Sequence, residues 1–257
     1  MRGLLSMVLA SCLAATAHGD ELDGLQKDLR SPEEQKAVEA ATRIGEDASP
    51  RALDVALDEL AVGVPPKVAA ALLAGLAGRK EPRAVEVLTL YARHRMPELR
   101  KKAIVALGEV PDQRPTPVLI AALSDSVEEV RAAAARALAK RKETSAEDAL
   151  VKLLAHKDQA AVDALAQIGG PMLSRKLGEL IGQIPDALLA NTLGGLLERA
   201  DFGPDPVRVD VVKAVAKLPG ADATAVLTDY VKATEKDPKR PSRAEARKAL
   251  EARGVNQ

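Results

Sequence analysis

An internal repeat constrains the fold of this chain more than any other feature. Three runs of apolar or small residues begin 31 residues apart and share the helical spacing i, i+4, i+7 and i+8. In order, these runs are Val68, Leu72, Gly75, Leu76; Leu99, Ala103, Ala106, Leu107; and Val130, Ala134, Ala137, Leu138. Each run lines one face of a helix, and a period of this length is typical of stacked helical hairpins. We therefore expect an all-α fold, an α-solenoid of antiparallel hairpins.

Weaker copies extend the repeat in both directions. Two begin at Val207 and Ser242, and a degenerate one begins at Pro32. Second helical patterns lie between the runs, at 51–62, 83–93, 116–123, 146–156 and 223–233. Proline and glycine breakers separate neighbours, so consecutive helices are expected to pack antiparallel. No alternating run is flanked by hairpin turns, and we predict no β-sheet.

The middle of the chain is less regular. Residues 161–169 look like a truncated copy, and the distance from Leu165 to Val215 is too long for one repeat and too short for two. Helices at 172–184 and 186–199 are expected to fill this gap. We predict a solenoid over 32–257 with an irregular junction around 158–204, which Phe202 would plug.

Aromatic residues are almost absent, with Tyr 2, Phe 1 and Trp 0. This scarcity argues against an ordinary enzyme core, a base-stacking nucleic-acid platform and an aromatic cage. Alanine, leucine and valine must supply the 47% of hydrophobic residues. Small residues let helix axes approach to the low end of the ~8–10 Å range. Gly194-Gly195 fits such a close contact, whereas Gly169-Gly170 fits a helix stop.

The first residues have the pattern of a secretory signal peptide. A positive start at Arg2 precedes an apolar stretch over 3–17, and residues 15–17 form an A-x-A cleavage site. The stretch is shorter than the ~20 residues that a transmembrane helix needs. We expect cleavage after Ala17, or alternatively after Gly19. Residues 1–17 would then be removed, and 18–31 would form a linker.

A lipid anchor is the alternative reading of the same segment. Leu9 to Cys12 resembles the lipobox of bacterial lipoproteins, in which the cysteine becomes the lipidated N-terminus. Cys12 is the only cysteine, so no intrachain disulfide can form. The expected location is periplasmic or secreted, with a lipoprotein as the alternative, and no membrane span is expected.

The runs at 97–108 and 130–138 resemble the second helix of HEAT repeats, closest to the short bacterial kind also seen in phycobilisome lyases. The resemblance covers most of 32–253. In that family an Asp before the second helix and an Arg inside it form a polar ladder between repeats. Asp125 and Arg131 match these positions, and Arg100 and Arg208 are the other expected ladder arginines. Departures from the pattern are Gln35 and Ala69 in place of the Arg, and His94 where an Asp would precede Arg100.

No catalytic or metal-binding pattern stands out in the sequence. The three histidines, His18, His94 and His156, lie far apart, and none has a second His or Cys at a metal-ligand spacing. Nucleophile-elbow, phosphate-loop and dinucleotide motifs are absent from the sequence. We therefore expect a protein that is not an enzyme and has no cofactor. The alternative is a HEAT-like enzyme or cofactor-handling protein of the lyase type.

The balance of basic and acidic residues indicates which class of partner the chain can bind. Lys+Arg is 37 and Asp+Glu is 37, so the chain has no electrostatic footprint for nucleic acid. In HEAT-type stacks the second helices line the concave face, which makes Lys101, Lys102, Arg136 and Lys140 candidate contacts. We expect a monomeric, non-catalytic scaffold that binds a protein partner through this face.

Overall fold

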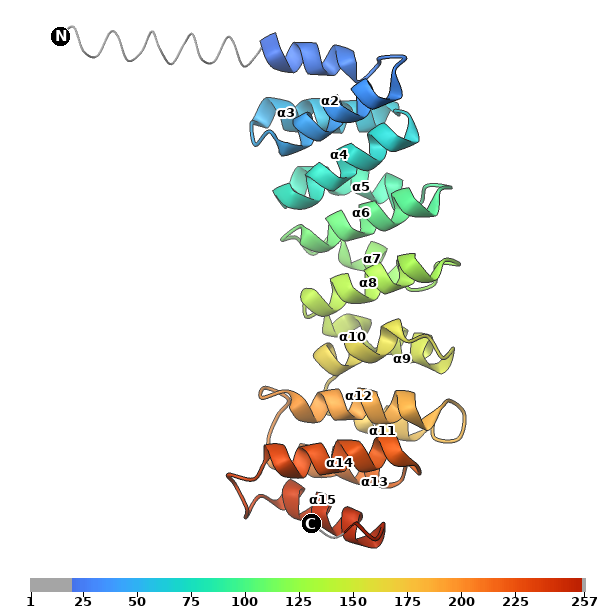
Figure 1. Ribbon diagram of the computed structural model, residues 1–257, viewed down its shortest axis with the longest axis vertical. Coiled ribbons are helices and arrows are strands. Elements are labelled where there is room, and N and C mark those ends of the chain that lie inside the picture. Colours follow the sequence, from blue (N-terminus) through green and yellow to red (C-terminus); the bar gives the residue numbers. More distant parts are fainter. Residues whose placement is uncertain (1–19, 256–257) are drawn as a thin grey trace, which may run out of the picture. The chain divides into compact units, whose positions relative to one another are not determined.

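The computed structural model describes residues 20–255, and these form two compact units. The boundary between the units falls between Val118 and Leu119, inside helix α7 (Thr116–Ala122). Each unit is a stack of helical hairpins (Figure 1). Residues 20–255 contain no strand beyond an isolated bridge between Ile181 and Ile184. The predicted all-α solenoid without a β-sheet is confirmed.

The first unit holds two layers of helices. Its members are α2 (Glu34–Glu46), α3 (Pro50–Val62), α4 (Pro66–Arg79), the 3-10 turn η1 (Pro82–Ala84), α5 (Val85–Tyr91) and α6 (Pro97–Glu109). Helices α2, α4 and α6 pack side by side in one row, and α3 contacts α5 behind them (Figure 1). Proline occupies the first turn of α3, α4 and α6, where its missing N–H would have no helical partner anyway.

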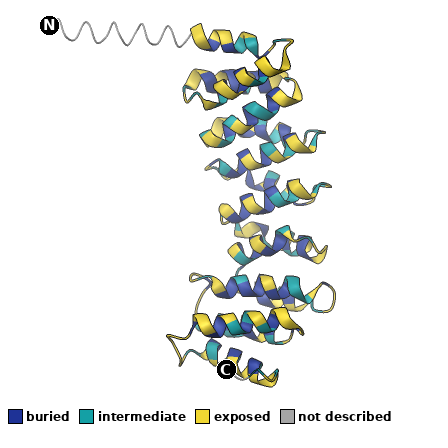
Figure 2. Ribbon diagram, in the orientation of Figure 1, coloured by how far each residue is buried: buried dark blue, intermediate teal, exposed yellow. Residues whose placement is uncertain are grey.

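Small residues allow the helices of the first row to approach closely. A Cβ added at Gly75 of α4 would overlap the Cα of Gly45 in α2 and lie 2.9 Å from the carbonyl carbon of Gly45. Leucines flank this contact, and Leu72, Leu73 and Leu76 are all at most 1% exposed. Buried residues occupy the faces that neighbouring helices share (Figure 2). The core therefore forms through close backbone approach rather than through aromatic rings.

The prediction of a linker over 18–31 is wrong for most of this segment, because residues 20–28 form a helix. Leu22, Leu25 and Leu29 of this segment are at most 8% exposed. Gln26 and Arg30 also donate hydrogen bonds to Oε1 of the buried Glu59 in α3, at 3.1 and 2.9 Å. The apolar spacing 22, 25, 29 is the helical signal that identifies this segment.

The second unit also has two layers of helices. After the C-terminal part of α7 it comprises α8 (Glu128–Lys140), η2 (Thr144–Ala146), α9 (Glu147–Ala155), α10 (Ala160–Ile168), α11 (Leu173–Gly178), α12 (Asp186–Glu198), α13 (Asp205–Ala216), α14 (Ala221–Ala233) and α15 (Pro241–Ala252). Helices α8, α10, α12 and α14 pack in succession and form the front row. Helices α11, α13 and α15 pack in succession in the back row (Figure 1).

The two C-terminal copies lie in the back row of the second unit, although their sequences resemble α8, which lies in the front row of that unit. They correspond to α13 and α15, and α13 contacts α11. The extra hairpin α11–α12 takes up the chain between α10 and α13. The helix expected over 172–184 ends at Gly178, because the following turn needs the left-handed conformation of Gly182, with φ of 78°.

Phe202 lies in the turn between α12 and α13. It is 3% exposed, and the Arg199 guanidinium stands 5.6 Å from its ring centroid. This burial agrees with a packing role rather than a ligand-binding one. Within residues 20–255, no helix is both long enough and apolar enough to cross a membrane.

Candidate interaction site

Arg131 joins two successive turns of the second unit. Its Nη1 donates to the backbone carbonyl of Asp125 at 2.9 Å, and its Nε lies 2.5 Å from Oδ2 of Asp158. The Asp125 carboxylate accepts from the backbone N–H of Val127 at 2.9 Å. Asp158 accepts from Ala160 in the same way, also at 2.9 Å. Each aspartate therefore orders its own turn, while Arg131 reaches the aspartate of the next repeat.

His94 takes the place of the aspartate in the first unit. Its Nδ1 accepts from the backbone N–H of Met96 at 3.1 Å, and Arg100 donates to the His94 carbonyl at 3.0 Å. The imidazole also stacks on Tyr91, with ring centroids 5.7 Å apart. A ring nitrogen can supply the acceptor that the turn needs, so the departure at His94 preserves the local geometry.

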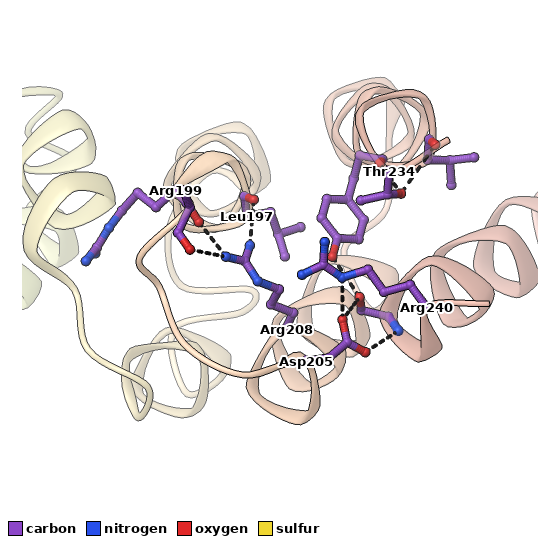
Figure 3. A network of polar contacts seen from close by, with 10 residues as sticks. Leu197, Arg199, Asp205, Arg208, Thr234 and Arg240 are labelled. Atoms are coloured by element: carbon purple, nitrogen blue, oxygen red, sulfur yellow. Dashed lines mark hydrogen bonds and ion pairs between the residues drawn. The ribbon is translucent and has the colours of Figure 1, made fainter. Parts of the chain in front are cut away.

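Arg208 has a different role from the one that the HEAT resemblance implies. It is 4% exposed, and it donates to the carbonyls of Leu197 at 2.9 Å, Ala200 at 3.3 Å and Arg199 (Figure 3). These carbonyls end α12 and have no partner within that helix. Arg208 therefore caps the C-terminus of α12, where a positive charge is also favoured by the helix dipole.

Asp205 anchors a polar network that links α13 to α14 and α15 (Figure 3). Its carboxylate accepts from Arg240 Nε at 2.6 Å, from the Ser242 hydroxyl at 2.5 Å and from the Ser242 N–H at 2.9 Å. The Tyr230 hydroxyl lies 2.7 Å from Ser242 Oγ. Burial by itself would raise the pKa of Asp205, but the hydrogen bonds from Ser242 and Arg240 outweigh it and lower that pKa. Ser242 is fully buried, so the network is structural rather than an exposed nucleophilic site.

A groove of about 810 Å³ opens beside the Arg131–Asp158 pair. Its polar lining comes from the ends of α7 and α9 and the starts of α8 and α10, and includes Glu128, Arg131, Lys152, His156, Asp158 and Gln159. Both positive and negative side chains line it. Among residues 20–255, no group of three or more His, Cys, Asp or Glu is arranged to hold a metal ion. The groove therefore offers a mixed polar surface.

The four predicted contact residues lie on two helices, α6 of the first unit and α8 of the second. Lys101 is exposed and Lys102 is half-buried on α6, whereas Arg136 and Lys140 are exposed one turn apart on α8. Arg136 Nε donates to the Ala132 carbonyl of its own helix at 3.1 Å.

The outward residues of α10, α12 and α14 are absent from the predicted contacts, because the repeat pattern favoured the C-terminal copies as the helices of the binding face. These exposed residues are Asp163, Gln167, Asn191, Glu198, Asp222 and Asp229. Their spacing of one or two turns within each helix was visible in the sequence, but the row that each helix occupies was not.

The family model for HEAT repeats matches residues 53–139 and 116–189, which together span more than half of the chain. The chain belongs to the HEAT-repeat family. Its matched region includes α4 and α6 of the first unit, and α8, α10 and the Arg131–Asp158 link of the second. This HEAT-repeat chain has no significant match among curated protein sequences.

Several solved structures share the HEAT-type architecture. An engineered protein is 23% identical, with a TM-score of 0.51 and coverage of 94% of this chain and 80% of that one. The CpcE–CpcF complex of phycocyanin lyase from a Nostoc species is 16% identical, with a TM-score of 0.49 and coverage of 90% and 94%. Human deoxyhypusine hydroxylase in complex with glycerol is 18% identical, with a TM-score of 0.43 and coverage of 95% and 99%. At these identities the likeness concerns the fold alone.

Proposed function

We propose that this HEAT-repeat protein is an exported, non-catalytic scaffold that binds a protein partner across the outward face of α8, α10, α12 and α14. The observation that supports this proposal is the packing of the four helices in direct succession. Their outward side chains therefore share one extended surface, which is the kind of surface that repeat proteins use for binding.

This face carries charges of both signs. Arg136 and Lys140 are basic residues of α8, where Glu129 is also exposed, and Asp163, Glu198 and Asp222 are acidic residues of the next three helices. Asp163, Glu198 and Asp222 make no side-chain hydrogen bond or ion pair with other residues in the described part of the chain. A partner whose charges are complementary to this face would be oriented correctly and would associate faster. Such complementarity affects orientation and association rate more than it affects affinity. Lys101 and Lys102 are candidate contacts on the first unit.

Site-specific photocrosslinking in the native host tests the binding face. A photoreactive residue at Gln167 or Asn191 would lie on the face, whereas one at the exposed Ala155 of α9 would lie outside it. We expect one adduct of defined mass from the first two positions and none from Ala155. Equal labelling from all three positions, or no adduct from any, would contradict the proposal.

Export is the second part of the proposal. Cleavage after Ala17 or Gly19 would cut before residue 20, where the packed N-terminal helix begins. Either cut therefore keeps Leu22, Leu25 and Leu29 in the mature protein. The intact mass of the protein purified from its host tests this: a mature chain starting at residue 18 or 20 supports export. An uncleaved chain would count against export, and a lipid adduct on Cys12 would replace the soluble form by an anchored one.

A further inference from the structure

The back row of the second unit carries a groove that the proposed binding face does not use. It has a volume of about 620 Å³ and lies between the α11 segment and α13. Three residues of α13, namely Asp210, Lys213 and Ala214, line it at helical spacing together with the C-cap residue Lys217. We propose that this groove binds an acidic segment of a partner protein that carries one apolar anchor residue.

Three cations in the groove are available to a ligand. Arg175 comes from α11, and Lys213 and Lys217 come from α13 and the residue that caps it. Their side chains make no hydrogen bond or ion pair with any other residue in the described range. By contrast, the neighbouring Lys176 contacts Glu147 and Asp148, each at 2.6 Å. Lys213 and Lys217 stand one helical turn apart, which suits two carboxylates at a matching spacing.

Ser174 adds a hydrogen-bond donor to the floor of the groove. The residue is 6% exposed and lines the groove, and its hydroxyl makes no hydrogen bond with another residue of the described range. The buried hydroxyls of Thr192 and Thr234 are engaged by backbone carbonyls at 2.7 Å, whereas solvent reaches the Ser174 oxygen. A carboxylate or carbonyl of the ligand could therefore accept from Ser174.

The apolar part of the groove sits at its α11 end. Met172 is 57% exposed, and Pro171 and Ile181 line the groove with it. A flexible thioether adapts to apolar partners of different shape. A leucine-like side chain of the ligand would cover Met172, while the carboxylates of the same ligand would reach Lys213 and Lys217.

The same groove disfavours a nucleic acid. Glu179 and Asp210 line it beside the cations, so a continuous phosphate backbone would meet repulsion. None of its lining residues is aromatic, so bases would have nothing to stack on. A segment with separated carboxylates avoids both problems, which is why the partner is assigned as an acidic polypeptide.

Fluorescence anisotropy with a synthetic peptide tests the assignment on the mature chain. The probe is a labelled helical peptide with one leucine and glutamates one turn apart, and its control has glutamine at each glutamate. We expect saturable binding of the glutamate peptide that weakens as salt rises. The double variant Lys213→Glu/Lys217→Glu should bind at least about tenfold more weakly. Ser174→Ala and Met172→Ala should each weaken binding without reversing any charge.

A matched charge reversal separates the groove from general electrostatics. Arg247→Glu/Lys248→Glu changes the net charge by the same amount on α15, where neither residue lines the groove. This control should bind within about twofold of the parent chain. Equal losses from both double variants, equal binding of the glutamine peptide, or no saturable binding up to about 1 mM would overturn the proposal. So would Ser174→Ala and Met172→Ala variants that fold normally and bind like the parent.

Discussion

A single pair of glycines sets the distance between α2 and α4. Gly45 and Gly75 face each other with no room for a methyl group on Gly75, because that group would overlap the Gly45 backbone. Backbone cannot rotate away as the end of a long side chain can, so the helices would have to separate. Ring-free packing thus depends on particular small residues and not only on average composition.

Replacing Gly75 by alanine should therefore destabilise the protein. Overpacking of this kind costs about 1–3 kcal/mol, which exceeds the up to ~1 kcal/mol that alanine gains in helix propensity. Urea unfolding followed by circular dichroism measures the difference. Gly78→Ala is the matched control, since a Cβ at Gly78 of the same helix meets nothing within 4 Å. Gly78→Ala should be neutral or stabilising, and a loss equal to that of Gly75→Ala would contradict the packing argument.

Arg208 shows how one charged side chain can cap the C-terminus of a helix. Its guanidinium serves three carbonyls at the end of α12 while it is almost wholly buried. Removing it leaves those acceptors without a donor in a site that water reaches poorly.

Arg208→Ala should lower the free energy of unfolding by about 2–4 kcal/mol, because several buried acceptors lose their partner together. Arg208→Lys keeps the charge but not the planar fork, so it should fall between alanine and the parent. Differential scanning calorimetry can rank the three proteins. Arg247→Ala, at an exposed site on α15, should unfold like the parent; an equal loss there would remove the case for a specific cap.

At the level of helices, polar links tie each hairpin to the next over about one repeat. Arg131 reaches Asp158, Arg199 reaches the Gly169 carbonyl at 2.9 Å, and Arg253 reaches the Ala216 carbonyl at 3.1 Å. Two of these arginines stand at the ends of their helices and bind the C-terminal carbonyls of a preceding one. These two links therefore satisfy acceptors that the helix itself leaves unpaired, whereas Arg131 pairs with a side-chain carboxylate.

The Asp205 network predicts how stability changes in acid. Because the folded pKa of Asp205 lies below its unfolded value, its contribution is present above about pH 4 and is lost as pH falls through the folded pKa. The Asp205→Asn variant lacks this contribution. The difference in urea midpoint between parent and variant should be largest near neutral pH and should shrink below about pH 4.

An exposed carboxylate provides the comparison for this titration. Asp201 also has a lowered pKa, through a hydrogen bond from Arg199, but solvent screens it. Asp201→Asn should change the midpoint little at any pH. A difference for Asp205→Asn that stays constant from neutral to acidic pH would show that the network does not depend on the ionised carboxylate.

Taken as a chain of repeats, the protein buries its core in local steps. Each helix mainly contacts its neighbours within a row and the partner in its hairpin. Stability in such an arrangement is close to a sum of hairpin and neighbour terms, so a local defect should remain local.

Hydrogen exchange with mass spectrometry can test this locality using the Gly75→Ala variant. Amides of α2 and α4 should exchange faster than in the parent, because their shared contact is disrupted. Amides of α12 to α15 should keep the parent rates under native conditions. Faster exchange throughout residues 20–255 would instead indicate one cooperative unit and would contradict the repeat-by-repeat picture.

The amino-acid pattern predicted most helices, the absence of a sheet and the small-residue core, because these depend on local features. Apolar residues at a 31-residue period and the prolines at Pro66 and Pro97 act within a few residues of themselves. The segment over 20–28 was missed although its leucines follow the same rule. Its short length and its place beside the predicted cleavage site favoured a linker.

The assignment of helices to rows required long-range contacts. An apolar stripe has the same spacing in either row, so α13 and α15 matched the front-row pattern while packing behind it. The partners of Arg131 and Arg208, and the groove that Ser174 and Lys213 line together, likewise depend on residues that lie many positions apart in the chain. Hydrophobic periodicity specifies that a helix buries one face, whereas chain connectivity and packing together select the neighbour that covers it.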